Sequence, residues 1–375
     1  EALKDLIAPG NAPVVDNLEK DGAIVIGRTN TPEFSMRGTT DNVIHGRTYN
    51  PWNDWASPGG SSGGASAAVM SGMGSLAHGN DIAGSLRIPS TATGACTVKP
   101  GLGRVPAYNP SQTQERGLIA QLMSVQGVIA REIKDVRLGM QSLINYDPRD
   151  PWMVDMPFQS KEIKAPIKVG FTKETLGEPM HPAINKALEN AIDALKDAGY
   201  ILEEIDLPEF EDAANFSAKT LFGEIKTLHE KDYKNLGSEN FNLVAENYFK
   251  IISPFEGEDL LLGMAKRSYF FREWNLFFRK YPLVLTPFLL YPTYEWNRDT
   301  QGIEGTKEVL AGMFYAHTMN YMGIPAGVVS ANYNDGLPVG VQIISSRFHE
   351  DVILNACEEI EKRVGIMAEK LFERG

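Results

Sequence analysis

Residues 59–89, GGSSGGASAAVMSGMGSLAHGNDIAGSLRIP, restrict the fold more than any other stretch of the chain. Glycines flank the adjacent serines Ser61 and Ser62, and Ser85 follows in a second glycine-containing turn. A flexible linker has a similar composition at its start. However, ASAAVMSGM is typical of a helix and GSLAHGND of a short strand, and linkers are seldom interrupted by packed elements. We therefore interpret the stretch as two backbone turns, each carrying serine, joined by packed secondary structure.

Several other chemistries lack their sequence patterns. The stretch has no P-loop lysine, no serine of the chain begins an S-x-x-K motif, and no H-x-x-x-H or C-x-x-C spacing occurs. Gly59–Gly63 matches G-x-S-x-G, but this short pattern arises easily by chance in glycine-rich segments. No histidine of the chain lies in a sequence motif that would mark it as the partner of such a serine. His45 and His78 are most simply polar or core residues. We expect neither a metal nor a cofactor.

A hydrolase without a metal must activate a hydroxyl with a base and stabilise an oxyanion with hydrogen-bond donors. The small residues of Asp81–Ser85 can supply the donors, because a tight turn can point successive backbone N–H groups at one position. The serine stretch therefore favours covalent catalysis over phosphate binding.

Along the rest of the chain, helical and strand patterns alternate, which predicts an α/β fold. Val14, Val15 and Leu18 form one face of a helix that stops at Gly22, and a strand is expected over 23–27. Further strands are predicted within 167–171, 200–208, 284–288, 328–333 and 339–344, and helices within 112–145, 181–199, 211–280 and 349–363. One large mixed sheet fits this order better than two independent domains.

The composition and charge of the chain restrict the kinds of partner that it is expected to bind. The chain has 43% hydrophobic and 22% charged residues, typical of a globular protein, and a net charge of −12 without a basic run. We therefore expect no nucleic acid and no membrane partner, since the apolar segment 281–292 is too short to span a bilayer. Cys96 and Cys357 lie among small and apolar residues, which predicts buried thiols, a reducing compartment and a cytoplasmic location.

The serine blocks resemble the signature of the amidase signature family, G-G-S-S-G-G followed by G-x-D-x-G-G-S-[IVL]-R-x-P and a G-x-K-P element. Here they appear as 59–64, 79–89 and 97–100, with a spacing of 24 positions from Ser61 to Ser85. Residues 22–34, 48–53 and 323–345 also resemble family blocks. The resemblance implies one amidase signature domain over 1–375, with a large mixed sheet covered by helices on both faces. It leaves 205–280 as a helical, aromatic-rich insertion that forms part of the substrate pocket.

The resemblance also implies roles for individual residues. Ser85 becomes the acyl-forming nucleophile, and Ser61 becomes a bridging serine whose peptide bond with Gly60 is cis. The remaining roles are an oxyanion hole of backbone N–H groups, substrate binding and support of the turns. The oxyanion hole is assigned to Ile82, Ala83, Gly84 and Ser85. Substrate binding is assigned to Ser35 and Ser61, and support of the turns to Gly60, Ser62, Asp81 and Arg87.

The chain departs from the family pattern twice. Ala83 replaces a usual glycine, which a turn tolerates if its φ is negative. The family's base is a lysine that burial keeps neutral, and counting back from Ser61 by the family's spacing leads to a position ahead of Glu1. We interpret Lys4 as a surface lysine and Lys99 as part of the K-P element rather than as the base.

The sequence thus predicts a cofactor-free serine hydrolase that cleaves small-molecule carboxylic amides through an acyl-enzyme, with esters and carbamates as side substrates. The aromatic region 211–280 favours an apolar or aryl substrate group. Two alternatives stay open: a catalytically silent protein that keeps the fold without its lysine, and a glutamyl-tRNA amidotransferase component of the A type. The sequence leaves a homodimer open as well.

Overall fold

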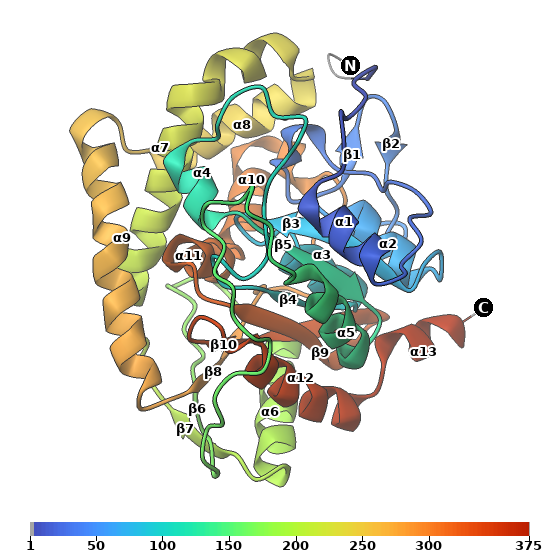
Figure 1. The fold of residues 1–375 in the computed structure, drawn as a ribbon, viewed down its shortest axis with the longest axis vertical. Coiled ribbons are helices and arrows are strands. Elements are labelled where there is room, and N and C mark those ends of the chain that lie inside the picture. Colours follow the sequence, from blue (N-terminus) through green and yellow to red (C-terminus); the bar gives the residue numbers. More distant parts are fainter. Residues whose placement is uncertain (1–3, 375) are drawn as a thin grey trace.

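The computed structural model describes residues 4–374, which form a mixed sheet between two layers of helices (Figure 1). The strand order is β3-β5-β4-β9-β10-β8-β6-β7. Neighbours from β3 through β8 pair antiparallel, whereas β6 pairs parallel with both β8 and β7. The strands are β3 (Leu76–Asp81), β4 (Cys96–Lys99), β5 (Val125–Ala130), β6 (Lys168–Phe171), β7 (Ile201–Glu204), β8 (Leu283–Pro287), β9 (Ala326–Asn334) and β10 (Leu337–Ser345).

Helices cover both faces of the sheet, as the sequence predicts. One face packs against α1 (Pro13–Lys20), α5 (Ile133–Leu143), α6 (Pro182–Asp197) and α12 (Glu350–Val364). On the other face lie α2 (Gly63–Met70), α3 (Arg87–Thr93), α4 (Leu118–Met123), α7 (Phe210–Leu236), α8 (Glu239–Ile252), α9 (Gly257–Phe278), α10 (Gly302–Ala311) and α11 (Phe314–Met322). The small elements are α13 (Met367–Phe372), β1 (Asp41–Asn42), β2 (Gly46–Arg47) and the 3-10 turns Glu33–Ser35 and Arg298–Thr300.

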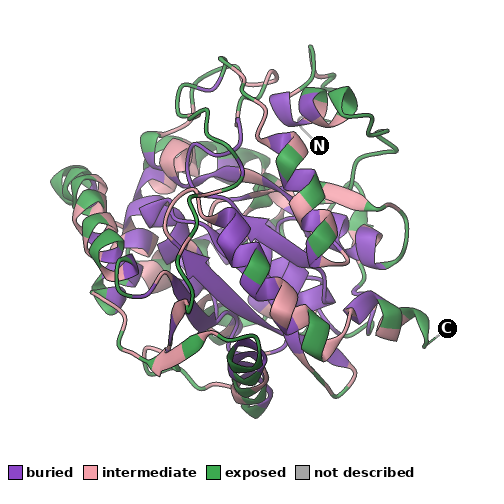
Figure 2. Cartoon of the chain, turned by 60° about the horizontal axis from the view of Figure 1, so that its bottom comes forward, coloured by how far each residue is buried: buried purple, intermediate pink, exposed green. Residues whose placement is uncertain are grey.

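The central strands are buried on both sides, which explains their composition. Every residue of β10 is buried, including its Gly, Gln and Ser residues as well as its Val and Ile residues. Figure 2 shows the same arrangement as a buried sheet between helices whose outer sides are exposed. Strands with helices on both faces need small or apolar residues at successive positions rather than at every second one.

The sequence prediction was wrong at one strand. Residues 23–27 form no strand, and the side chains of Ile24, Val25 and Ile26 are exposed. The segment passes near the edge of the sheet, where the Ile26 side chain approaches Gly74. Within residues 4–374 no neighbouring strand pairs with it, and an apolar run becomes a strand only when its backbone groups find such a partner.

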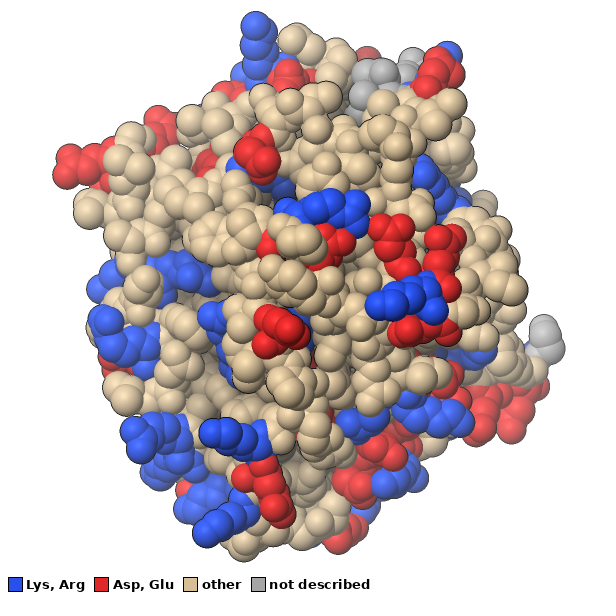
Figure 3. Space-filling view, viewed as in Figure 1, with Lys and Arg blue, Asp and Glu red and all other residues tan. Residues whose placement is uncertain are grey.

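The other predicted elements are present at or near their expected positions. The span 112–145, expected to be helical, also contains the strand β5, and α13 follows the last predicted helix. Both cysteines are free and buried, as predicted. No helix within residues 4–374 is long and apolar enough to cross a lipid bilayer. On the face seen in Figure 3, acidic and basic side chains are mixed with wide uncharged areas.

Candidate active site

The second serine block forms a tight turn between the end of β3 at Asp81 and the start of α3 at Arg87. The Asp81 carboxylate accepts hydrogen bonds from the Gly84 N–H at 2.7 Å and the Leu86 N–H at 3.1 Å. Arg87 donates to it through Nε and Nη2, both at 3.1 Å. Burial alone would raise the pKa of Asp81, but the charge and hydrogen bonds of Arg87 outweigh burial and lower that pKa. A fully buried ion pair therefore holds the turn from its inner side.

Arg87 also connects the turn to distant parts of the chain. Its Nη1 donates to Gln342 Oε1 of β10 at 2.7 Å, and its Nη2 donates to the Ala316 carbonyl of α11 at 2.9 Å. Asn320 of α11 returns a hydrogen bond from Nδ2 to the Asp81 carbonyl at 2.9 Å. Sequence reasoning missed Gln342 and Asn320, because nothing in their local sequence shows that they would meet the turn.

The first serine block lies directly against this turn. The Ser62 N–H donates to the Ser85 carbonyl at 3.1 Å, and the predicted cis peptide bond between Gly60 and Ser61 is present. A Cβ atom at Gly60 would collide with the Arg37 carbonyl oxygen, so the close approach requires glycine. Within residues 4–374 neither the Ser61 nor the Ser85 hydroxyl hydrogen-bonds to the protein. The structure thus brings the two predicted serine blocks together and leaves both hydroxyls available.

The backbone donors of the turn differ from the prediction at one residue. In this structure the Gly84 N–H donates to the Asp81 carboxylate, so it is not among the free donors of the turn. The N–H groups of Ile82, Ala83 and Ser85 have no hydrogen-bond acceptor within residues 4–374. Ala83 has no positive φ, which satisfies the condition for replacing glycine, whereas Gly84 has a φ of 111°. A Cβ atom on Gly84 would also lie 2.7 Å from the Ala316 side chain.

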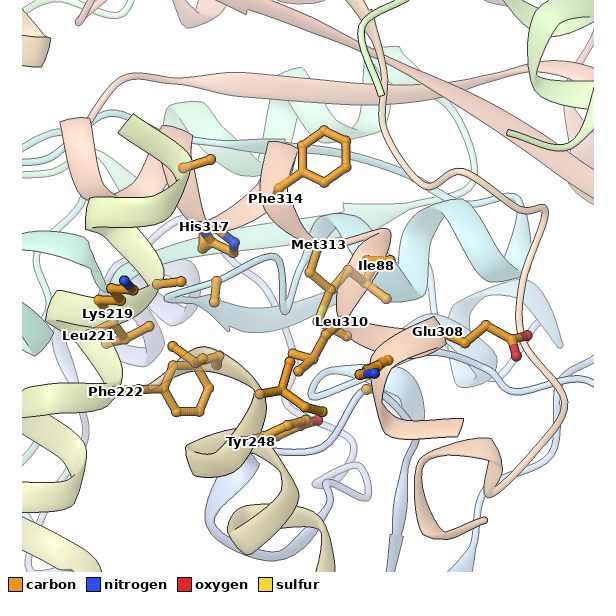
Figure 4. Close-up of a pocket in the computed structure, with 18 of the residues that line it drawn as sticks. Ile88, Lys219, Leu221, Phe222, Tyr248, Glu308, Leu310, Met313, Phe314 and His317 are labelled. Atoms are coloured by element: carbon orange, nitrogen blue, oxygen red, sulfur yellow. The ribbon is translucent and has the colours of Figure 1, made fainter. Parts of the chain in front are cut away.

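The turn opens into a cavity of about 1190 Å³. Gly60, Ile82, Ala83 and Ser85 line one end, and Ser35 contributes to the same cavity. Figure 4 shows other residues that line the cavity, most of them from α7, α8, α10 and α11. Its labelled residues are Lys219, Leu221, Phe222, Tyr248, Glu308, Leu310, Met313, Phe314 and His317, together with Ile88 of α3.

The charges of the cavity lie mainly at its rim. Glu178, Glu211, Asp212, Glu304 and Lys307 line the cavity but are exposed to solvent. In contrast, the wall residues Ile88, Leu221, Met313 and Phe314 are buried and present apolar surface. The buried wall can therefore pack against an apolar ligand body, although charged side chains, among them buried Arg37, also line the cavity.

Two lysines singled out in the sequence lie away from this cavity. Lys4 is exposed, as expected of a surface lysine. Lys99 is fully buried in β4 and donates from Nζ to the Pro100 carbonyl at 2.9 Å. Burial, and then the charge of Arg87, lower the pKa of Lys99 to about 7. Lys99 is therefore a buried amine behind the turn, on the side of Asp81 and Arg87.

Residues 4–374 contain no group of three or more His, Cys, Asp or Glu side chains suited to hold a metal ion. Instead, the arrangement offers two serine hydroxyls, backbone N–H donors beside one of them and an apolar cavity. Together with the α/β fold, it fits the class of enzymes that attack a carbonyl carbon with a serine.

Comparison with known proteins identifies the family. The family described as Amidase matches residues 1–354, and the chain therefore belongs to the amidase signature family. It is 42% identical to an indoleacetamide hydrolase of Bradyrhizobium japonicum over 99% of this chain and 80% of that protein. It is also 28% identical to the A component of the glutamyl-tRNA(Gln) amidotransferase of Methanosarcina acetivorans, over 96% of this chain and 79% of that protein.

A solved structure agrees with this assignment. A bacterial aryl acylamidase of the amidase signature family superimposes with a TM-score of 0.80 at 25% identity. The match covers 99% of this chain and 79% of the acylamidase. The predicted fold class and family are confirmed, and the protein is an amide-hydrolysing enzyme.

Proposed function

We propose that the protein hydrolyses small carboxylic amides with an apolar or aryl acyl group, using Ser85 as the nucleophile. The observation that carries this proposal is the position of Ser85, which lies beside the Ser61 block and lines a cavity with a buried apolar wall. The 42% identical relative is named for indoleacetamide, an acetamide that carries an aromatic ring.

In the proposed reaction, the Ser85 hydroxyl attacks the amide carbon and its proton passes through Ser61 to a neutral lysine. The developing oxyanion accepts hydrogen bonds from the free N–H groups of Ile82, Ala83 and Ser85. The leaving amine takes up the proton, and water then hydrolyses the acyl-enzyme. The lysine in this step is the base that the family resemblance implies.

The helical segment 205–280 is proposed to act as the part of the domain that selects the substrate. Helices α7 and α8 lie within it and contribute Leu221, Phe222 and Tyr248 to the cavity. Free, buried Cys96 and Cys357 suit a reducing compartment, so the cytoplasm is the proposed location.

Labelling with a serine-reactive fluorophosphonate, followed by intact mass measurement, tests the nucleophile. We expect one adduct on the protein and on a Ser75→Ala control, which changes an exposed serine between the two serine blocks. The Ser85→Ala variant should carry no adduct, and its rate of phenylacetamide hydrolysis should fall by roughly 10⁴-fold or more. An active Ser85→Ala variant would exclude Ser85 as the nucleophile. Complete absence of labelling and hydrolysis in the unmodified protein would favour the catalytically silent alternative.

A further inference from the structure

His317 is an imidazole in an otherwise mainly apolar wall of the cavity. It follows Ala316, whose carbonyl accepts from Arg87 Nη2 and whose side chain packs on Gly84 of the turn. Figure 4 shows His317 on α11, across from Lys219 and Leu221 of α7. The imidazole therefore stands next to the reacting end of the cavity rather than at its rim.

A hydrogen bond to Ser217 sets the tautomer of this imidazole. The Ser217 hydroxyl, on α7, lies 3.0 Å from His317 Nδ1. Ser217 is fully buried, and Nδ1 is the one hydrogen-bond partner of its hydroxyl within residues 4–374. If this hydroxyl only accepted a hydrogen bond, its own proton would have no acceptor, which is costly in a buried site. Ser217 therefore donates to Nδ1, and the ring proton resides on Nε2.

The environment also keeps the imidazole uncharged. Burial, followed by the charge of Arg87, lowers the pKa of His317 to about 3. The residue is nevertheless partly accessible, because it faces the cavity. Nε2 has no hydrogen-bond partner within residues 4–374, so it presents a neutral N–H donor to whatever fills the cavity.

We propose that His317 is a specificity-determining residue whose Nε2–H donates a hydrogen bond to a neutral acceptor on the substrate's acyl group. This inference rests on the proposed function, because it assumes that the amide occupies this cavity. It extends that proposal from apolar acyl groups to a subclass: aryl acyl groups with a ring nitrogen or ether oxygen placed to meet His317. An acyl group with only carbon at that position leaves the donor unpaired, which lowers affinity.

Binding to the Ser85→Ala protein tests the inference without requiring turnover. Phenylacetamide is compared with 2-, 3- and 4-pyridylacetamide by calorimetry at pH 8, where the pyridine nitrogen is unprotonated. These amides have the same shape and differ by one ring acceptor. We expect at least one pyridyl isomer to bind roughly threefold to tenfold more tightly than phenylacetamide, the range of one neutral hydrogen bond.

Adding His317→Phe or His317→Asn should abolish this preference, while the affinity for phenylacetamide stays within about twofold. Two further single substitutions test whether the preference is lost only because the wall of the cavity is disturbed. Ser217→Ala should weaken the preference, because it removes the group that fixes the tautomer. Lys219→Met, on the same wall, should leave it unchanged.

Equal binding of all four amides, no measurable binding of any of them, or a pyridyl preference that survives loss of His317 would each overturn the inference. Loss of the preference in Lys219→Met alone would assign the donor to Lys219 instead. The proposed function fails separately, if the protein that retains Ser85 does not hydrolyse amides even though the pyridyl preference is present.

Discussion

The two ends of the cavity are held by different forces. At the serine end, the turn 81–87 is fixed by a buried ion pair and by hydrogen bonds that link Asp81 and Arg87 to β10 and α11. At the opposite end, the wall is held by packed aromatic and aliphatic side chains, such as Phe222 against Tyr248 at 5.5 Å between ring centroids. Directional bonds therefore hold the proposed reacting groups, whereas shape and apolar contacts hold most of the proposed substrate wall.

This difference implies different tolerance to mutation. A directional network loses its geometry when one member is removed, and the partners left behind are buried without compensation. Apolar packing is less specific, and volume changes alter affinity and stability by smaller amounts. We expect mutations at the serine end to affect folding and catalysis together, and mutations in the wall to change substrate preference first.

The largest effect is expected for Asp81→Asn. The substitution keeps the shape of the side chain but leaves the Arg87 charge buried without its carboxylate. The free energy of unfolding should fall by about 3–5 kcal/mol, measured by urea denaturation. Amide hydrolysis should be lost as well, because the turn that positions Ser85 is no longer held.

A surface ion pair provides the contrast for this measurement. Glu359 pairs with Lys362 at 2.7 Å on the exposed side of α12. Glu359→Gln should leave the unfolding transition unchanged, since exposed pairs contribute little. If both variants had similar stability, the buried pair would not be what holds the turn.

A smaller effect is expected for Phe222→Ala in the wall. Loss of this ring should lower kcat/KM for phenylacetamide roughly tenfold to hundredfold, chiefly through KM, and should change acetamide hydrolysis little. Phe249→Ala is the matched control. Phe249 belongs to α8, and its ring centroid lies 6.4 Å from that of Phe222, but Phe249 does not line the cavity. Equal losses for both amides would mean that Phe222 supports the fold rather than the substrate.

The most gradual effect, and the smallest for a single pH unit, concerns the neutral state of His317. Its pKa of about 3 lies below the usual value for histidine, so between about pH 6.5 and 3 the unfolded chain binds a proton that the folded protein does not. Stability therefore falls as pH decreases through this window, by at most about 1.4 kcal/mol per pH unit from this group. Because the pKa of Asp81 is lowered, this carboxylate also stabilises the fold, and that stabilisation is lost mainly below about pH 4.

Denaturation of the unmodified protein and of His317→Phe at several values between pH 4.5 and 7.5 isolates this contribution. The variant should lose less stability on acidification, and the difference between the two proteins should grow steadily toward pH 4.5. Parallel curves would show that His317 is not held neutral by the fold.

Most helices and strands were predictable because their apolar residues recur with the right period and their ends carry glycine or proline, as in α1 and α6. Residues 23–27 are the exception: their composition is typical of a strand, but among the described residues no neighbouring strand pairs with their backbone. At the site, the local spacing of glycine and serine predicted both serine blocks, and the family resemblance implied the cis peptide bond. It missed Gln342 and Asn320, and it assigned Gly84 an N–H that Asp81 already binds.

The sequence by itself determined the chemistry available to this protein: two serines in glycine turns, small residues that expose backbone donors, and elements that alternate into an α/β sheet. These features depend on neighbours along the chain, and local spacing is enough to specify them. Only the tertiary structure decided which backbone donors remain free, which charges are buried and where the imidazole of His317 points. Those properties depend on contacts between segments such as α7, α11 and the turn 81–87, which are distant in sequence and meet only when the core has packed.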